Sequence, residues 1–566
     1  MITKSRRNLI PAIAAVLLTG VSQAQPPQQR QSLSSDWTDQ QVVFTESTDV
    51  WKAIRNQQDP RYVRKVLRDL LRQKSQERER DKEKEKDKDK DKEGKGNTPP
   101  SVRDWNTTLT GSGGTASFSV GHIPAKFVFD VNQPPSCTND FVVTGTGLAG
   151  SATQASVVAY NNLYSNPSGT GFCSGTGPKV MWAYNLATNQ IRHAAVLSLD
   201  GTRAIFVDAA GGFHVVRWSS ATGNGTAVGA PATLAATTPG ATDPGGVIDW
   251  RIAAGLGVTS PFVDYTADVA YVTTGTGVVR KIANVFKGIP SEVTTGGWPV
   301  TLPGGVTNLS TPVYDFNSKR VYVTVNGTIY FIDTTQATVS ASATTWAFAT
   351  AAASYPVIVD STNQKVYAWS PSNGSNAVVA QADTALSAGS RVTASVGGTA
   401  SQSPLGGDFN NAYYSGNATS ARLYVVGNDA TGTSTTRVPA FYMFSFDSAW
   451  KLLTTATGGP LRLATAAAEA SYVTGFFNST QNKDYMFVGV TTACSTAVTG
   501  GCIRSIDVSG STFPTAANVN NVILAANGGT YGIAVDNNSS AAEASSVYYV
   551  MRSTNSLVKA TQSALQ

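Results

Sequence analysis

Residues 262–282, FVDYTADVAYVTTGTGVVRKI, contain a unit that recurs along this chain. An apolar stretch ends at Asp264, a turn follows, and two further stretches rich in Val and Tyr flank the turn TTGTG. Related units occupy residues 313–333, VYDFNSKRVYVTVNGTIYFID, and 357–381, VIVDSTNQKVYAWSPSNGSNAVVAQ. Branched and aromatic residues favour strands, while Asp, Asn and Gly favour turns. Each unit is therefore predicted to be a set of short antiparallel strands.

The Asp or Asn at the end of the first stretch aligns the units, and it is predicted to cap a turn by accepting hydrogen bonds from backbone N–H groups. Eight positions fit: Asp130, Asp200, Asp264, Asp315, Asp360, Asp408, Asn478 and Asp536. From Asp264 to Asp408 the intervals are 51, 45 and 48 residues, which is typical of four-stranded propeller blades. Radially packed sheets cover one another's faces, which one sheet alone cannot do. The sequence thus predicts an all-β fold, a β-propeller of eight blades, with seven as the alternative.

These units resemble known propeller families. The stretches at 260–282 and 311–333 are similar to YVTN and quinoprotein-like repeats, which pair a "PxVD" strand with a "VYVG" strand. LSLDGTRAIFVD, residues 197–208, resembles the TolB-type repeat "SPDGxxIAF". The whole layout is similar to that of large secreted bacterial proteins. The resemblance implies a fold and leaves the function open, because propellers support many functions.

Three regions are expected along the chain. Residues 1–24 have a basic start, an apolar run and the ending Ser22-Gln23-Ala24, which together indicate a secretory signal peptide. Residues 25–105 are predicted to be a polar, charged and disordered spacer, with one short helix near 59–75 and the run DKEKEKDKDKDKE at 81–93. The propeller is expected to occupy residues 106–566. We expect secretion to the periplasm, the medium or the cell surface, with no transmembrane segment after signal cleavage.

The net charge of +6 comes from the N-terminal region. Residues 1–105 hold 22 of the 43 Lys and Arg and 16 of the 37 Asp and Glu, so residues 106–566 carry 21 of each. A neutral body lacks the basic surface of a nucleic-acid-binding protein. No nucleic acid is expected among its partners.

The four cysteines are predicted to form two local disulfides, Cys137–Cys173 and Cys494–Cys502, each fastening one loop. Oxidising compartments favour disulfides, and four cysteines permit three pairings. A zinc site is the competing hypothesis, but the chain has no CxxC pair and only three histidines. The closing strand of the ring is predicted at residues 115–120, TASFSV, paired with the last unit.

The sequence favours a secreted or cell-surface binding, scaffold or adhesion module without catalytic activity. An extracellular protein or carbohydrate is the expected partner, with Trp51, Trp105 and Trp369 as candidate contact platforms. The alternative is a propeller enzyme, either a quinoprotein-like oxidoreductase or a carbohydrate-active hydrolase or lyase. No cysteines are adjacent, no GxSxG occurs, and His214 in GGFHVVRW is predicted to be structural. No cofactor is expected, while pyrroloquinoline quinone (PQQ) and calcium stay open.

Overall fold

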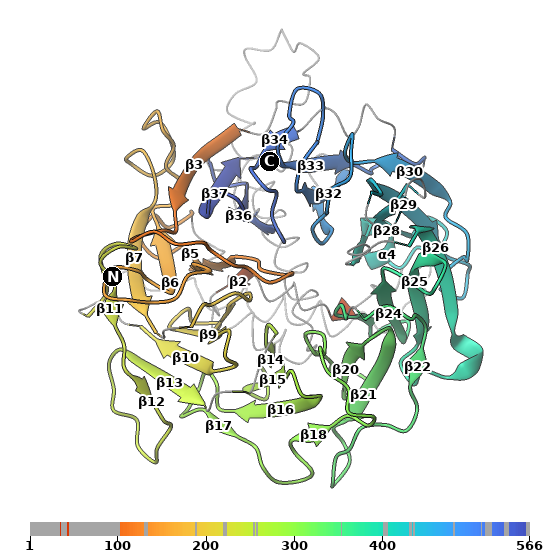
Figure 1. Ribbon diagram of the computed structural model, residues 1–566, viewed down its shortest axis with the longest axis horizontal. Helices are drawn as coiled ribbons and strands as arrows, with labels where there is room; N and C mark the ends of the chain where they lie inside the picture. Colours follow the sequence, from red (N-terminus) through yellow and green to blue (C-terminus); the bar gives the residue numbers. More distant parts are fainter. Residues whose placement is uncertain are drawn as a thin grey trace, which may run out of the picture.

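Eight sheets surround one centre in the computed structural model (Figure 1). The structure describes residues 34–35, 42–44, 102–129, 134–186, 189–218, 223–252, 255, 259–352, 354–399, 406–429, 433, 436–478, 482–510, 512–514, 523–536 and 543–561. The all-β, eight-bladed propeller predicted from the repeats is confirmed. The predicted signal peptide, the predicted helix near 59–75 and the charged run at 81–93 lie outside the described residues.

Each blade is a sheet whose first strand lies nearest the ring centre. Blade 1 contains β4 Ala125–Val128, β5 Phe141–Gly145, β6 Val157–Asn161 and β7 Lys179–Asn185, and blade 2 contains β8 Val196–Leu197, β9 Arg203–Val207, β10 Phe213–Arg217 and β13 Ile248–Ile252. Blade 3 contains β14 Phe262–Asp264, β15 Val269–Thr273, β16 Val278–Ala283, β17 Ser291–Glu292 and β18 Val300–Thr301. Blade 4 contains β19 Val313–Asp315, β20 Arg320–Val325, β21 Thr328–Asp333 and β22 Trp346–Ala347. Short strands add in parallel to the outer edges of blades 1 and 2: β11 Ala232–Thr233 and β12 Ala236–Thr237.

Blades 5 to 8 repeat the pattern with two short helices, η2 Ala388–Ser390 and α4 Asn411–Tyr414. Blade 5 contains β23 Ile358–Asp360, β24 Lys365–Ser370, β25 Asn376–Asp383 and β26 Val392–Gly398, and blade 6 contains β27 Gly407–Phe409, β28 Arg422–Asn428, β29 Pro439–Ser445 and β30 Gly458–Arg462. Blade 7 contains β31 Thr474–Asn478, β32 Lys483–Val490, β33 Cys502–Asp507 and β34 Ile523–Ala525. Blade 8 contains β35 Ala534–Asp536, β36 Ser546–Met551, β37 Ser556–Thr561 and β3 Val102–Thr108. Among the described residues, no helix is long and apolar enough to span a bilayer.

The turn after the innermost strand has the same construction in several blades. Asp264 accepts hydrogen bonds from the N–H groups two and three residues later, both at 3.0 Å. Asp360 accepts the equivalent pair at 2.9 Å each. The residue four positions after the Asp has a positive φ in blades 3, 4 and 5, at Asp268, Lys319 and Gln364. The side-chain cap stabilises this tight turn, in which one residue must adopt the left-handed conformation.

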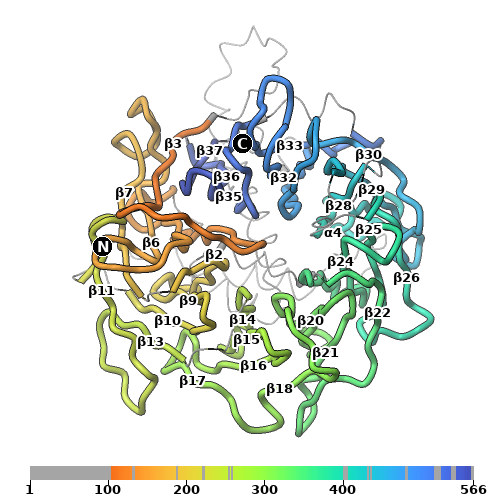
Figure 2. The backbone as a smooth tube through the Cα atoms, in the orientation of Figure 1, coloured from red at the N-terminus to blue at the C-terminus, as the bar shows by residue number. Residues whose placement is uncertain are grey.

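The ring closes in one blade that contains both ends of the described propeller. β3 pairs antiparallel with β37 over six positions, from Val102 opposite Thr561 to Thr108 opposite Ser556 (Figure 2). The prediction that residues 115–120 supply this outer strand is wrong, although the closure principle holds. Residues 115–120 form no strand, and Ser117 N–H instead bonds the carbonyl of Gly147 in blade 1 at 2.9 Å. β3 begins at Val102, four residues before the expected start of the propeller at Asn106.

Both predicted disulfides are confirmed. Cys137–Cys173 and Cys494–Cys502 have Cα–Cα distances of 5.7 Å and 6.2 Å, and together they pair all four cysteines. Each bond lies within one blade: Cys137–Cys173 joins two loops of blade 1, and Cys494–Cys502 joins a loop of blade 7 to the start of β33, at sequence separations of 36 and 8. The cysteines therefore serve loop anchoring, as the sequence indicated.

Removing the two disulfides separately is expected to have unequal effects. Cys137→Ala/Cys173→Ala should lower the free energy of unfolding by about 1 kcal/mol more than Cys494→Ala/Cys502→Ala, because the loop-closure entropy in the unfolded chain grows with loop length. Urea unfolding of the two double variants measures the difference. An equal loss in both variants would contradict the loop-entropy explanation.

Candidate functional site

The innermost strands of blades 1 and 5 bind further strands at the ring centre. β1, Ser34–Ser35, pairs antiparallel with β23, with Ser34 opposite Asp360. β2, Val42–Phe44, pairs in parallel with β4, with Val42 opposite Lys126. We call the central edges of β4 and β23 the inner-edge site. Three blades lie between blades 1 and 5 in either direction, so the two edges face each other across the ring.

On the blade 1 side, the inner-edge site rests on a buried ion pair. Lys126 of β4 has 0% exposure, and its Nζ lies 3.1 Å from Asp536 of β35 in the neighbouring blade 8. The same Nζ donates to the carbonyl of Phe127 at 2.8 Å and to the hydroxyl of Tyr164 at 3.2 Å. Because a buried ammonium group is stable only with partners, Lys126 fixes β4 against the closing blade.

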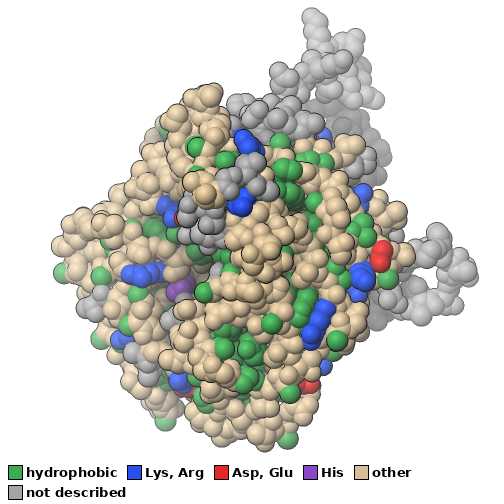
Figure 3. Space-filling view, turned by 45° about the vertical axis from the view of Figure 1, so that its right-hand side comes forward, with side chains coloured by type: hydrophobic (Ala, Val, Ile, Leu, Met, Phe, Trp, Pro, Cys, Tyr) green, Lys and Arg blue, Asp and Glu red, His purple; other side chains and the backbone are tan. Residues whose placement is uncertain are grey.

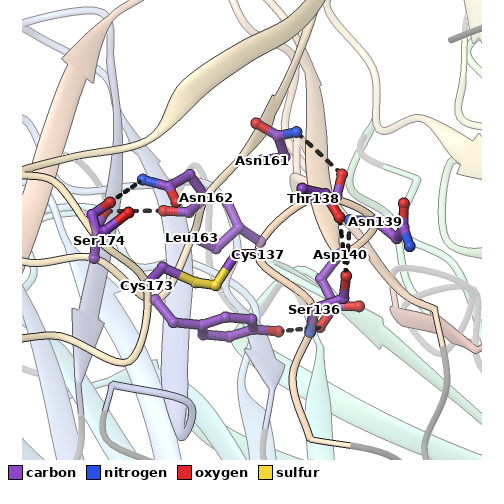
Figure 4. The surroundings of a disulfide bond; sticks show 12 residues. Ser136, Cys137, Thr138, Asn139, Asp140, Asn161, Asn162, Leu163, Cys173 and Ser174 are labelled. Carbon is purple, nitrogen blue, oxygen red and sulfur yellow. Dashed lines mark hydrogen bonds between the residues drawn. A yellow bond between two sulfur atoms is a disulfide. The ribbon is translucent and has the colours of Figure 1, made fainter.

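Tyr164 links this ion pair to the Cys137–Cys173 loop. Figure 4 shows the disulfide with Asp140 beside it. The Tyr164 hydroxyl donates to Asp140 at 2.5 Å, and Asp140 also accepts the N–H of Phe129 at 2.8 Å. Burial and then the neighbouring Asp140 raise the pKa of Tyr164 well above its usual value, so the phenol stays protonated and acts as a donor. The disulfide loop thereby holds the polar groups behind β4 in place.

A second buried ion pair joins the closing strand to blade 8. Lys559 of β37 has 0% exposure and binds Asp104 of β3. The hydroxyl of Thr561 lies between two carboxylates, 2.7 Å from that of Asp104 and 2.8 Å from that of Glu543. Burial raises the pKa of Asp104 to about 6, although Lys559 opposes this effect. The pair favours β3 at this edge, because another strand would leave buried Lys559 with the more distant Glu543, at 3.9 Å, in place of Asp104.

On the blade 5 side, the polar groups behind β23 are also paired within the fold. The hydroxyl of Tyr413 donates to Asp360, and Tyr413 and Tyr367 join their hydroxyls at 3.0 Å. Gln381 donates to Tyr367 at 2.9 Å. Burial, followed by the charge of Asp360, raises the pKa of Tyr413 well above its usual value. Both ends of the inner-edge site therefore have rigid, hydrogen-bonded support.

His214 of β10 lies in the most enclosed charged network of the described residues. Its Nδ1 is 2.9 Å from Asp249 and its Nε2 is 3.3 Å from Asp208, and all three side chains have 0% exposure. Arg251 binds Asp208 at 2.9 Å. Burial alone would lower the pKa of His214, but the two carboxylates outweigh burial and raise it to about 9. This position matches the structural role predicted for His214.

The other two histidines lie close together between blades 1 and 2. The ring nitrogens of His122 are 2.9 Å from the Thr144 hydroxyl and 3.1 Å from the carbonyl of Arg192. Burial lowers the pKa of His122 to about 4, and burial together with His122 lowers that of His193 to about 3. Both imidazoles are therefore neutral at physiological pH. Among the described residues, no group of His, Cys, Asp and Glu has an arrangement that could hold a metal ion.

The remaining predicted anchor residues have varied surroundings. Asp200 accepts the N–H of Thr202 at 3.0 Å, and Asp315 accepts that of Ser318 at 2.8 Å. Asp408 reaches the next blade, where it accepts the N–H of Gly475 at 2.7 Å. Asp130 and the side chain of Asn478 lie outside the described residues.

Two of the three candidate Trp residues are buried. Trp105 and Trp369 have 4% and 1% exposure, so the prediction that they bind a ligand is wrong. The indole of Trp105 donates to the carbonyl of Leu163 at 2.9 Å and anchors β3 to blade 1. Trp51 lies outside the described residues.

Asp484 provides a test of electrostatics between blades 6 and 7. It accepts the N–H of Asn411 at 2.6 Å, but burial and the nearby Asp408 and Asp507 raise its pKa to about 7. The stability that its neutral form provides is complete below about pH 4 and is lost as the pH rises through about 7. Asp484→Asn should therefore raise the free energy of unfolding at pH 8, by up to about 4 kcal/mol, and change it little at pH 4.

Asp507→Asn is the matched control for Asp484→Asn. Burial would raise the pKa of Asp507, but Lys483 at 2.7 Å and Ser509 outweigh burial and lower it. This variant should lose stability at pH 8, which is the opposite sign. Urea unfolding at both pH values distinguishes the two, and a loss of stability in Asp484→Asn at pH 8 would contradict the assignment.

Comparisons with known proteins come from structures alone, since no family model and no curated protein matches the sequence. The crystal structure of BamB from Moraxella catarrhalis is similar over 81% of this chain and 97% of its own, at 11% identity and a TM-score of 0.39. Sqt1 from Saccharomyces cerevisiae is similar over 82% and 98%, at 10% identity and a TM-score of 0.47. A putative 6-phosphogluconolactonase from Bacteroides uniformis is similar over 62% and 87%, at 13% identity and a TM-score of 0.34. These values carry no information on function.

Proposed function

We propose that the protein is an exported, non-catalytic propeller that acts as a binding or scaffold module for an extracellular protein or carbohydrate. The observation that carries this proposal is the pairing of buried ionisable groups. Lys126, Lys559 and His214 each have 0% exposure and bind carboxylates of the chain itself. A catalytic acid or base must reach its substrate, whereas these groups stabilise packed blades.

The surface supports a binding role without nucleic acid. Residues 106–566 carry equal numbers of basic and acidic residues, and Figure 3 shows Lys and Arg scattered over the visible face rather than gathered in a patch. Nucleic-acid binding depends on concentrated positive charge. The two disulfides support a secreted or periplasmic location, because such bonds persist in oxidising compartments. Membership of the YVTN or TolB-like families stays a prediction.

A thermal-shift screen tests the proposal. The purified protein is incubated with a glycan panel, calcium, and PQQ, and turnover is measured with an artificial electron acceptor and with glycoside substrates. A ligand at one hundred times its dissociation constant stabilises a protein by about 2.7 kcal/mol, which is detectable. We expect no turnover and no PQQ-dependent shift. Stabilisation by PQQ with electron transfer, or glycoside cleavage, would establish the enzyme alternative instead.

A further inference from the structure

We infer that the inner-edge site docks an extended polypeptide from a partner protein by strand addition, and that β1 and β2 occupy it until the partner segment replaces them. This inference rests on the proposed binding function and names its partner class. It begins from backbone geometry: an unpaired strand edge presents a row of N–H and C=O groups that another extended chain can bind. Blades 1 and 5 already bind such segments at their central edges.

The occupation of these two edges is selective. Among the described residues, the other six blades end at their innermost strands, with no strand added on the central side. Both β4 and β23 have the buried polar support described above. A rigid edge strand is a good template, because little order is lost when a second strand binds.

The pairing of β1 and β2 is small enough to be displaced. β1 pairs through two residues and β2 through three, and the β2–β4 pairing is parallel, which is slightly less stable per residue than antiparallel pairing. The permanent closing strand β3, by contrast, pairs over six positions and adds a buried ion pair. A partner segment that pairs with more of either edge would therefore compete successfully.

The geometry also sets the length and chemistry of the partner segment. Seven Cα steps separate Ser35 from Val42, which allow a span of at most about 25 Å in extended chain. Residues 34–44 contain strands on both edges, so a partner segment of the same eleven-residue length suffices. Lys126 and Asp360 are engaged by other groups of the fold, so recognition depends on backbone hydrogen bonds and requires no charged side chain on the partner.

A peptide of this chain provides a defined probe. Fluorescently labelled peptide 30–48, RQSLSSDWTDQQVVFTEST, is titrated with the full-length mature protein and with a variant lacking residues 25–48. We expect saturable binding to the deletion variant and at least tenfold weaker binding to the full-length protein, whose site is occupied. The control peptide carries Val42→Pro and Val43→Pro, which remove two successive N–H groups, one of which must face β4. It should not bind.

A second variant guards against misfolding of the deletion. The full-length protein with Val42→Pro and Val43→Pro should bind the unmodified peptide at least tenfold more tightly than the unsubstituted protein does. If neither variant binds the peptide while retaining its melting transition, or if the proline peptide binds equally well, the docking inference is wrong. A glycan that binds in the thermal-shift screen while the peptide fails would leave the proposed function intact. If the peptide binds but the protein turns over a quinone substrate, the docking inference would stand and the proposed non-catalytic function would be wrong.

Discussion

Replacing β3 with seven Gly and Ser residues is expected to open the ring and lower the melting temperature by roughly 10 °C or more. The replacement removes Trp105, which is 4% exposed and packs on Tyr548, and truncating such a Trp costs about 3–5 kcal/mol. It also removes Asp104 from buried Lys559, whose remaining ion pair is with Glu543 at 3.9 Å, and this costs up to about 3–5 kcal/mol more. Together these losses approach the whole stability of an ordinary domain, about 5–15 kcal/mol.

The same replacement at residues 115–120 is the matched control. That segment forms no strand, and its removal breaks few backbone hydrogen bonds, such as the one from Ser117 to Gly147. Calorimetry should show a much smaller change, and light scattering should show a monomer. The β3 variant should instead aggregate through the exposed edge of β37. Equal effects of the two replacements would contradict closure by β3.

His214→Ala is expected to lower the free energy of unfolding by about 3–5 kcal/mol at pH 6, because it leaves Asp208 and Asp249 buried without their cation. The contribution of His214 is pH-dependent. Its pKa in the folded protein is about 9, so the stabilisation is complete below about pH 6.5 and is lost as the pH rises through about 9. The gap between the original protein and the variant should therefore narrow at pH 10.

His122→Ala separates this charge effect from the loss of packing. His122 is equally buried, but burial lowers its pKa to about 4, so it is neutral in both the folded and unfolded protein above pH 6.5. Urea unfolding at pH 7, 8 and 10 should give a nearly constant loss for this variant. If the loss of unfolding free energy in His214→Ala were also independent of pH, the charge interaction of His214 with the two carboxylates would not be the source of its stabilisation.

The sequence predicted the blades well because each turn carries a local signal. Asp264 and Asp360 bond N–H groups only two and three residues away, so the pattern is visible in a short window. Closure depends on a contact with no such signal. VRDWNTT at β3 contains two charged residues, a pattern that does not predict a buried strand, yet Asp104 binds Lys559, 455 residues later. TASFSV at 115–120 has the better strand pattern but no partner edge.

The inner-edge site was missed for a different reason. β1 and β2 contain two and three residues and pair through their backbones, which every residue except proline can do. Their composition therefore carries no signal of the pairing, and they fall in a stretch predicted to be a spacer. The role of His214 was predicted, but its partner Asp249 lies 35 residues away on another strand, so only the structure identifies the pair.

Closure by β3 also constrains the timing of synthesis. Blade 8 needs residues 102–108 and 556–561 together, so a chain still being elongated on a ribosome holds at most seven complete blades. Chains generally fold from the N-terminus as they emerge, and contacts between such distant residues form slowly because a long loop must close first. The nascent protein is therefore an open arc with two unpaired edges until residues 556–561 appear. During this time the arc must not aggregate with other chains through its open edges, a risk that ends when the ring closes.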